Sequence, residues 1–494
     1  MLYHLYELGQ SAMSPARSAA NSTRYFFRNP FNPLSYTNFG RNTAAASELM
    51  ERTTRRYKKP GFNLPETMVK GQSVPILEEV VWRRPFCNLI HFKKDFASGA
   101  RANEPRLLIV APLSGHYGTL LRGTVEAMLP FADVYITDWQ DARTVSLKDG
   151  GFDLDDYIDY VIETIELFKG DVHVMGVCQP AVPVLSAVAL MESRGNPFVP
   201  RSVVLKGGPI DTRKNPTGVN KLAEERGTNW FRKTVITAVP WPNAGYGRLV
   251  YPGFLQLTGF MAMNFDRHMD AHKKLFANLV KGDGDSVEKH KEFYDEYLAV
   301  MDLTAEYYLQ TVDQVFVKHL LPKGEMFHRG EFIDLSAIAR VAVMTVEGEK
   351  DDITGLGQCE AALGLCTNLH RSKKRHYVQL GVGHYGIFNG SRFRHEIVPR
   401  VVAFMSDNDV RGGSLKWLVS RLSGERGVAA APKPVELADE TRYVPSPTIA
   451  TVIEGEAIKI STLPAKPHLN SSRGRSLARI SALRGKAPKH RTLR

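Results

Sequence analysis

A single cysteine stands where a chain could carry a catalytic nucleophile. Cys178 lies in Gly176-Val-Cys-Gln-Pro180, between an apolar run typical of a buried strand and a run typical of a helix. The pattern matches the nucleophile elbow G-x-S-x-G, with cysteine replacing serine and proline replacing the second glycine. Gly176 is expected to leave room for the close approach of the helix to the strand. Thiolates held at a helix N-terminus beside an imidazole are effective nucleophiles. The spacing predicts acyl transfer through Cys178, and a buried structural cysteine is the alternative.

An acid and a histidine follow later strand-like runs. Asp351 and Asp352 come just after the apolar run 341–348, and His384 comes just after the run 376–380. The order nucleophile, acid, histidine is the chain order of the α/β-hydrolases. The acid would orient the imidazole, and the imidazole would take the proton of the thiol. Taken singly, the acid could be a solvated loop residue and the histidine a structural one, and residue type alone does not choose between the two aspartates.

Acyl transfer also needs an oxyanion hole built from two backbone N–H groups. Gln179 directly follows the nucleophile, so its N–H is one expected donor. The second would come from Leu113 or Ser114, in the loop after the apolar run 106–111. His116 in the same loop either lines the site or has a structural role.

The other motifs in the sequence indicate neither a metal site nor a nucleotide-binding site. His268 and His272 are four residues apart, but the glutamate of an H-E-x-x-H site is missing, so they are interpreted as a helix face. Cys359 and Cys366 have no second ligand pair, which makes zinc improbable. The glycine-rich segments match neither a Walker A loop nor a dinucleotide-binding fingerprint. The sequence therefore predicts no metal site, and the predicted acyl-transfer chemistry requires no cofactor.

The elements that would position these residues alternate between strand and helix. Alternation over 76–210 and again over 336–410 predicts a parallel-rich α/β sheet flanked by helices. The intervening segment, 211–335, is helical and aromatic-rich in character and is expected to form a cap or lid. Residues 1–75 are expected to form a helical N-terminal segment, and residues 411–494 a basic, low-complexity tail.

The positive charge is concentrated in the expected tail. The net charge is +12, and residues 459–494 hold ten lysines and arginines and no acid, which leaves 12 − 10 = +2 on residues 1–458. The tail is poor in large apolar side chains, so we predict that it is disordered. A mobile basic tail suits an anionic surface, either phospholipid or nucleic acid. A solvated tail that aids solubility is the alternative.

Composition and hydropathy further limit the class of protein to which this chain could belong. Hydrophobic residues make up 43% and charged residues 23% of the 494 residues, which predicts a sizeable packed core. The sequence has neither the apolar run of a transmembrane helix nor the pattern of a signal peptide, so a cytoplasmic protein is expected. A weak transit-peptide character of the first segment is the minor alternative. Four scattered cysteines do not form a disulfide framework.

Several longer motifs resemble one known family. They lie between residues 1 and 406 and read Arg28-Asn-Pro-Phe-Asn-Pro-Leu-Ser-Tyr, Ala111-Pro-Leu-Ser-Gly-His-Tyr, Tyr135-Ile-Thr-Asp-Trp, Val177-Cys-Gln-Pro, Gly207-Gly-Pro-Ile-Asp-Thr-Arg, Tyr251-Pro-Gly-Phe-Leu-Gln and Gly383-His-Tyr-Gly-Ile-Phe-Asn-Gly. With these motifs the chain resembles the intracellular polyhydroxyalkanoate (polyhydroxybutyrate) depolymerases of bacteria. The extension beyond about residue 410 departs from the shorter family pattern.

The resemblance implies an α/β-hydrolase fold with a cap and a Cys-Asp-His triad, which here would be Cys178, Asp351 and His384. It favours Asp351 over its neighbour and implies action on polymer storage granules inside the cell. The expected products are 3-hydroxybutyrate and oligomers, or a 3-hydroxyacyl-CoA if coenzyme A (CoA) is the acceptor. A polyhydroxyalkanoate synthase or related acyltransferase is the alternative, and Pro180 speaks against it because synthases carry glycine there. A non-enzymatic protein that binds granules or links them to the nucleoid is a third hypothesis.

Overall fold

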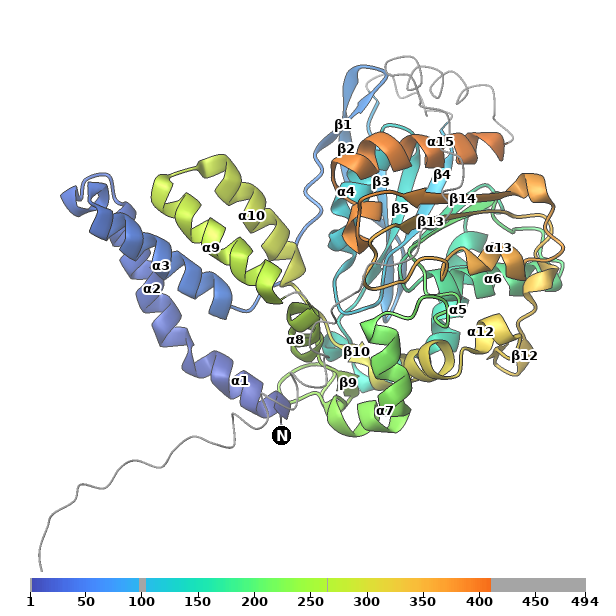
Figure 1. Cartoon of the computed structure of the whole chain (residues 1–494), viewed down its shortest axis with the longest axis horizontal. Coiled ribbons are helices and arrows are strands. Elements are labelled where there is room, and N and C mark those ends of the chain that lie inside the picture. Colours follow the sequence, from blue (N-terminus) through green and yellow to red (C-terminus); the bar gives the residue numbers. More distant parts are fainter. Residues whose placement is uncertain (1, 97–103, 264, 410–494) are drawn as a thin grey trace, which may run out of the picture. The chain divides into compact units, whose positions relative to one another are not determined.

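The computed structural model of the chain describes residues 2–96, 104–263 and 265–409 (Figure 1). The expected disordered basic tail, residues 411–494, lies outside the described residues. Within the described part, none of the helices combines the length and the apolar character needed to cross a membrane.

Nine strands of the described residues form one sheet. They are β1 (Glu66–Val69), β2 (Gln72–Arg84), β3 (Cys87–Lys94), β4 (Arg106–Val110), β5 (Asp133–Trp139), β6 (His173–Val177), β7 (Ser202–Lys206), β13 (Ala342–Gly348) and β14 (Lys374–Gln379). Their spatial order is β1-β2-β3-β5-β4-β6-β7-β13-β14. The pairs from β5 to β14 are parallel, whereas β1, β2 and β3 pair antiparallel with their neighbours. The α/β-hydrolase fold class predicted from the sequence is confirmed.

Helices cover both faces of this sheet. Those packed on it are α4 (Arg122–Met128), α5 (Leu154–Glu166), α6 (Ala181–Ser193), α13 (Ala361–Leu365) and α15 (Val398–Asp407). Figure 1 shows α4 and α15 on one side of the strands and α5, α6 and α13 on the other. Every residue of the central strands β6, β7 and β13 is buried, which explains why these strands read as continuous apolar runs in the sequence.

The edge of the sheet was harder to predict. β2 begins at Gln72, several residues before the first expected strand, and forms a hairpin with β1 that the sequence analysis missed. Much of β2 is exposed, so it lacks the apolar run that marks the central strands. The expected turn at Pro85 is present, between β2 and β3.

The segment expected to form a cap is mainly helical. Its elements are α7 (Gly218–Thr234), α8 (Gly253–Met263), α9 (Phe265–Lys281), α10 (Gly284–Tyr297), α11 (Ala305–Thr311), a π-helical turn (Val312–Val317) and α12 (Leu320–Lys323). It also contains short strands, namely β8 (Thr237–Ala238), β9 (Leu249–Tyr251), β10 (Leu303–Thr304), β11 (Phe327–His328) and β12 (Glu331–Phe332). Strands of two or three residues leave no period-2 pattern, so the sequence analysis did not find them.

The described part of the N-terminal segment contains three α-helices where two were expected. Where one helix was expected over residues 1–30, α1 (Leu2–Ala12) and α2 (Ser14–Arg28) are separated at Met13. The next helix, α3 (Asn38–Thr54), starts four residues earlier than expected because Thr37 caps it, its hydroxyl accepting the N–H of Gly40 at 3.0 Å.

Polar contacts attach the N-terminal helices to the cap. The guanidinium groups of Arg52 on α3 and of Arg55, the residue after α3, donate to Asp295 on α10 at 2.5 and 2.8 Å. Tyr3 on α1 is fully buried, and its hydroxyl donates to the Asp302 carboxylate at 2.7 Å. Burial and the nearby Asp141 raise the pKa of Asp302 to about 6, so this carboxylate depends on its hydrogen-bond donors.

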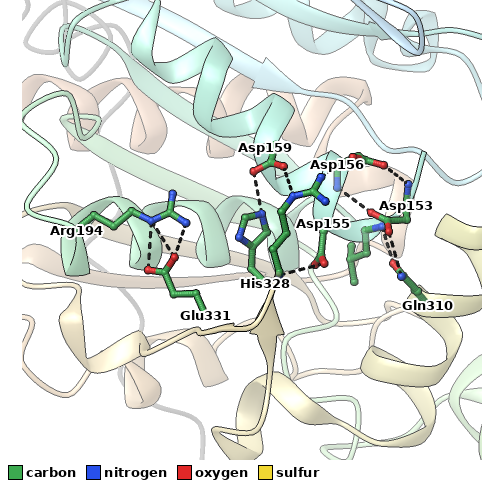
Figure 2. Close-up of polar contacts among 10 residues, drawn as sticks. Asp153, Asp155, Asp156, Asp159, Arg194, Gln310, His328 and Glu331 are labelled. Atoms are coloured by element: carbon green, nitrogen blue, oxygen red, sulfur yellow. Dashed lines mark hydrogen bonds and ion pairs between the residues drawn. The ribbon is translucent and has the colours of Figure 1, made fainter. Parts of the chain in front are cut away.

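Ion pairs also hold the β11–β12 hairpin, which connects the cap to the second part of the sheet. Arg329, in the turn between β11 and β12, donates to Asp159 at 2.8 Å and to Asp156 at 2.6 Å, both on α5. The carboxylate of Glu331 on β12 accepts three hydrogen bonds from the guanidinium of Arg194, which follows α6 (Figure 2). The β11–β12 hairpin is thus held on the helices that flank the sheet.

Candidate active site

Cys178 sits at a sharp turn between β6 and α6. Its φ is 67°, a left-handed conformation that residues other than glycine rarely adopt. The turn is held on both sides: the Cys178 N–H donates to the Lys206 carbonyl at 2.7 Å, and its own carbonyl accepts the N–H of Ala181 at 3.1 Å. Cys178 is partly exposed, whereas the other three cysteines are buried. Strained backbone of this kind concentrates at functional sites.

The glycines after β7 make room for this turn. A Cβ on Gly208 would lie 2.1 Å from the Cβ of Ala181, and a Cβ on Gly207 would lie 3.1 Å from Cε1 of His384. A Cβ on Gly176 would meet Val184 at 3.4 Å, an ordinary contact. The close approach expected at Gly176 of the elbow motif therefore occurs at Gly208 instead.

His384 pairs with one of the two candidate acids. Its Nδ1 lies 2.7 Å from Oδ2 of Asp351, and both side chains are at most 4% exposed. The other carboxylate oxygen of Asp351 accepts the N–H groups of Ile353 and Thr354, which fixes its orientation. Asp352 is exposed. The structure thus brings Asp351, and not Asp352, to the imidazole.

The loops that carry this pair follow adjacent parallel strands, β13 and β14. The N–H of Lys350 donates to the carbonyl of Val382 at 2.9 Å. A Cβ on Gly348 would lie 2.9 Å from that same carbonyl oxygen, and a Cβ on Gly383 would lie 3.1 Å from the carbonyl of Lys350. Backbone packed this closely holds the acid and the histidine in a fixed relation.

The ionisation of His384 links the pair to the cysteine. Burial lowers the pKa of its imidazole, but the charges of Asp351 and Cys178, and hydrogen bonds to both, raise that pKa well above its ordinary value. Since Nδ1 faces Asp351, Nε2 is the nitrogen left for the sulfur. An imidazolium between a carboxylate and the cysteine sulfur is the arrangement that a thiolate–imidazolium ion pair requires.

The three predicted oxyanion donors follow the adjacent strands β4 and β6. Val110 at the end of β4 is in register with Gly176 near the end of β6, so the two loops emerge side by side. Within the described ranges, the N–H groups of Gln179, Leu113 and Ser114 have no intramolecular acceptor. These groups remain available to an oxyanion, and their assignment stays a prediction.

Aromatic side chains hold the loop after β4 in place. The carbonyl of Ala111 accepts hydrogen bonds from Trp139 at 2.8 Å and from Tyr157 at 3.2 Å, and the carbonyl of Leu113 accepts one from Tyr307 at 2.9 Å. Tyr307 belongs to α11 of the cap. Burial raises its pKa well above the ordinary value, and the charge of nearby Cys178 adds to this.

Tyr307 was not predicted from the sequence to lie near the site. It is one of many cap aromatics, and nothing in its local sequence distinguishes a ring that reaches the loop after β4 from one in the cap's own core. Tyr385, next to His384, is a second tyrosine whose raised pKa reflects mainly burial and, in part, the charge of Cys178. Its position beside the motif histidine was the only available signal.

His116 has a structural role in the fold. It is 2% exposed, and its Nε2 lies 3.0 Å from the carbonyl of Tyr297 on the cap. Burial lowers the pKa of His116 to about 4, so the ring is neutral. Its ring packs between Phe260 and Tyr297, with centroids 5.2 and 5.3 Å away. This contact joins the loop after β4 to the cap.

Groups that could suggest a metal have structural partners. Among the described residues, ligand atoms of Glu347, Glu360 and His376 lie within 4.8 Å of one another. The Glu347 carboxylate already accepts backbone N–H groups of Gly357, Cys359 and Glu360, so it fixes that loop. On α9, Nδ1 of His272 contacts the carbonyl of His268 at 2.8 Å, as expected of two residues on one helix face.

Lys206 is a buried charge that the sequence analysis missed. It ends β7, its side chain is fully buried, and within the described part of the chain its Nζ has no hydrogen-bond partner. The ammonium lies 4.4 Å from the ring centroid of Phe393, and burial lowers its pKa to about 7. A lysine inside the apolar run 202–206 was the available signal.

Comparison with known proteins found one matching family model. Residues 207–409 match the family model described as "PHB de-polymerase C-terminus", which confirms the resemblance to polyhydroxybutyrate depolymerases. Together with the α/β-hydrolase topology, this match supports ester hydrolysis. No curated protein matches the chain in sequence.

Similar solved structures include a lipase and a bromoperoxidase. The putative lipase of Acinetobacter baumannii AYE is 14% identical and has a TM-score of 0.35, covering 67% of this chain and 93% of its own. The bromoperoxidase of Bacillus anthracis is 10% identical and has a TM-score of 0.39, covering 69% of this chain and 98% of its own. The fold assignment rests on the strand order described above.

Proposed function

Given a PHB de-polymerase region that contains both His384 and Asp351, we propose that this chain hydrolyses the ester bonds of poly(3-hydroxybutyrate) and related polyhydroxyalkanoates through Cys178. The observation that carries the proposal is the strained turn of Cys178 beside the buried His384–Asp351 pair. We place the reaction at the surface of polymer storage granules in the cytoplasm.

The first half-reaction transfers the acyl group to sulfur. The Cys178 thiolate attacks the ester carbonyl carbon, a C–S bond forms, and the N–H of Gln179 with that of Leu113 or Ser114 stabilises the oxyanion. As the ester C–O bond breaks, the departing alkoxide takes the proton from Nε2 of His384 and leaves as a chain with a hydroxyl end.

The second half-reaction frees the enzyme. Water attacks the thioester while His384 accepts its proton, the C–S bond breaks, and the thiolate re-forms. The product is 3-hydroxybutyrate or a short oligomer. If CoA is the acceptor, its thiol takes the place of water and the product is a 3-hydroxyacyl-CoA. The carboxylate of Asp351 stays ionised throughout and holds the imidazole in position.

The experiment compares Cys178→Ala with the wild-type chain on amorphous poly(3-hydroxybutyrate) particles. We expect the release of 3-hydroxy acid to fall by about 10³-fold or more. Assays with and without CoA identify the acceptor, and thermal melting checks that the variant is folded. Undiminished release by the folded variant would overturn the proposal. Polymer formed from 3-hydroxybutyryl-CoA would instead favour the synthase alternative.

Thiol labelling provides an independent control. Because Cys87, Cys359 and Cys366 are buried, iodoacetamide should alkylate Cys178 first. Activity should fall in step with the mass of a single label on the peptide that contains Cys178. Loss of activity that precedes this label would assign the chemistry to another residue.

A further inference from the structure

The turn between α2 and α3 exposes a dense group of large apolar side chains. In residues 25–39, six of them are at least 47% exposed, and Phe31 is 92% exposed. We call this group the aromatic tip; its members are Tyr25, Phe26, Phe31, Leu34, Tyr36 and Phe39. Single exposed apolar residues are ordinary, but a contiguous patch marks an interaction site.

The two sides of the turn join into one patch. Phe27 contacts Phe26 edge-on, with ring centroids 5.1 Å apart, and contacts Phe39 at 5.8 Å. Phe26 and Phe27 lie in the last turn of α2, whereas Phe39 lies in the first turn of α3. Figure 1 shows these two helices side by side, with the connecting turn at their free end.

The turn has a defined conformation. The side-chain amide of Asn32 donates to the carbonyl of Phe26 at 3.0 Å, and its oxygen accepts the N–H of Leu34 at 3.1 Å. A Cβ on Gly40 would lie 2.0 Å from the carbonyl oxygen of Leu34, so only glycine permits this approach. The polar groups are thus turned toward the backbone while the rings face outward. A surface organised in advance loses little conformational entropy on binding.

The charge around the tip is positive. Residues 8–47 contain four arginines and no aspartate or glutamate. Arg28 pairs with Glu48 at 2.6 Å, and Arg17 donates to backbone carbonyls of Gln10 and Thr54. Arg24 lies beside the tip, 4.9 Å from the ring centroid of Tyr25.

We infer that the aromatic tip docks the enzyme on the polyester itself, an inference that rests on the proposed function. An amorphous polyester offers a soft apolar surface without specific pockets, which suits projecting rings that are not part of a groove. Each ester hydrolysis leaves a carboxylate chain end, so a surface under attack becomes negative. The arginines near the tip are complementary to that charge, whereas an acidic tip would be repelled.

Docking through the tip would keep the active site at an insoluble substrate. α3 continues from the tip to the cap, where Arg52 pairs with Asp295. A tethered enzyme meets the next ester bond at a high effective concentration. Soluble esters reach Cys178 without the surface, so their turnover does not depend on the tip.

The experiment measures retention on amorphous poly(3-hydroxybutyrate) particles, using the full chain with Cys178→Ala so that the surface stays intact. The test variant adds Tyr25→Ser, Phe31→Ser and Phe39→Ser. Because three rings lose their apolar contact, we expect retention to fall about tenfold or more, in low salt and in about 0.5 M NaCl alike.

The matched control replaces three exposed rings elsewhere, with Phe198→Ser, Phe327→Ser and Phe332→Ser. Its retention should stay within about twofold of the parent. With Cys178 restored, tip and control variants should both turn over a soluble ester at the wild-type rate, and only the tip variant should be slow on particles.

Several results would overturn the inference. One is equal retention of tip and control variants. Another is tip-dependent binding to phosphatidylcholine vesicles as tight as that to polyester, which would make the tip a lipid-binding element. A third is a parent chain that light scattering shows to be a dimer and a tip variant that is a monomer, because the tip would then be a dimer interface. If the wild type releases no acid from particles but binds them through the tip, the proposed function fails while docking stands.

Discussion

At the scale of single residues, one carboxylate sets the ionisation of the candidate site. Asp351 is the principal cause that raises the pKa of His384, against the lowering effect of burial. Because the folded pKa is raised above the ordinary 6.5, the pair's contribution to stability is complete below that pH and is lost as pH rises through the raised value. A protonated His384 is also what the leaving alcohol needs.

Asp351→Asn should therefore lower both the rate and the pH at which His384 loses its proton. We expect kcat/KM on a soluble ester to fall by about 10³-fold or more, with the alkaline limb of the pH profile moved to lower pH. The neighbouring Asp352→Asn is a matched control, because that carboxylate is exposed, and it should stay within about twofold of the wild type. Equal losses in both variants would contradict the assignment.

Lys206 is a residue whose charge costs stability. Its folded pKa of about 7 lies below the ordinary 10.5, so the buried amine destabilises the fold fully below pH 7 and progressively less as pH rises toward 10.5. Lys206→Met should raise the free energy of unfolding by about 2–4 kcal/mol below pH 7, because methionine fills a similar volume without a charge. Urea unfolding at several pH values measures this gain, and a gain that does not shrink at high pH would contradict the explanation.

At the scale of elements, the elbow depends on how closely the N-terminus of α6 approaches the loop after β7. The contact is between Ala181 and Gly208, which are distant in sequence. The backbone hydrogen bond from Cys178 to the Lys206 carbonyl ties the same two segments together. Space at Gly208 is therefore a condition for the strained conformation of the nucleophile.

Gly208→Ala should disturb this junction. A methyl group 2.1 Å from the Cβ of Ala181 forces the two elements apart, so we expect a loss of about 1–3 kcal/mol in the free energy of unfolding and a larger relative loss of kcat than of soluble-ester binding. Gly218→Ala is the control, because an added Cβ there meets nothing within 4 Å. Indistinguishable unfolding curves for the two variants would refute the steric explanation.

At the scale of the whole molecule, polar contacts join the N-terminal helices to the cap, and the cap to a helix that flanks the sheet. Arg52 and Tyr3 hold the N-terminal helices on the cap, and Arg329 holds the returning hairpin on α5. The basic tail adds most of the net charge, and its interaction with an anionic surface stays a prediction from the sequence.

Removal of residues 459–494 should separate that interaction from catalysis. The net charge falls from +12 to +2, so binding to DNA and to anionic vesicles should weaken and lose most of its dependence on salt. Turnover of a soluble ester should be unchanged, because the residues of the site all precede residue 385. Co-sedimentation over a salt series measures the binding, and unchanged binding would show that the tail does not mediate it.

Much of the fold and part of the site could be predicted from the sequence because their signals are local. The buried strands are continuous apolar runs, and Cys178, an aspartate and His384 each follow one of them in the order typical of the fold. Parallel strands end at the same edge of a sheet, so this order alone placed the three residues near one another.

Only the tertiary structure decided the features that depend on contacts between distant segments. It paired His384 with Asp351 where residue type left two candidates, and it moved the essential close approach from Gly176 to Gly208. It also brought the hydroxyl of Tyr307 on the cap to the Leu113 carbonyl in the loop after β4, and it left the aromatic tip exposed. Burial and mutual approach depend on the whole chain, so no short stretch of sequence encodes them.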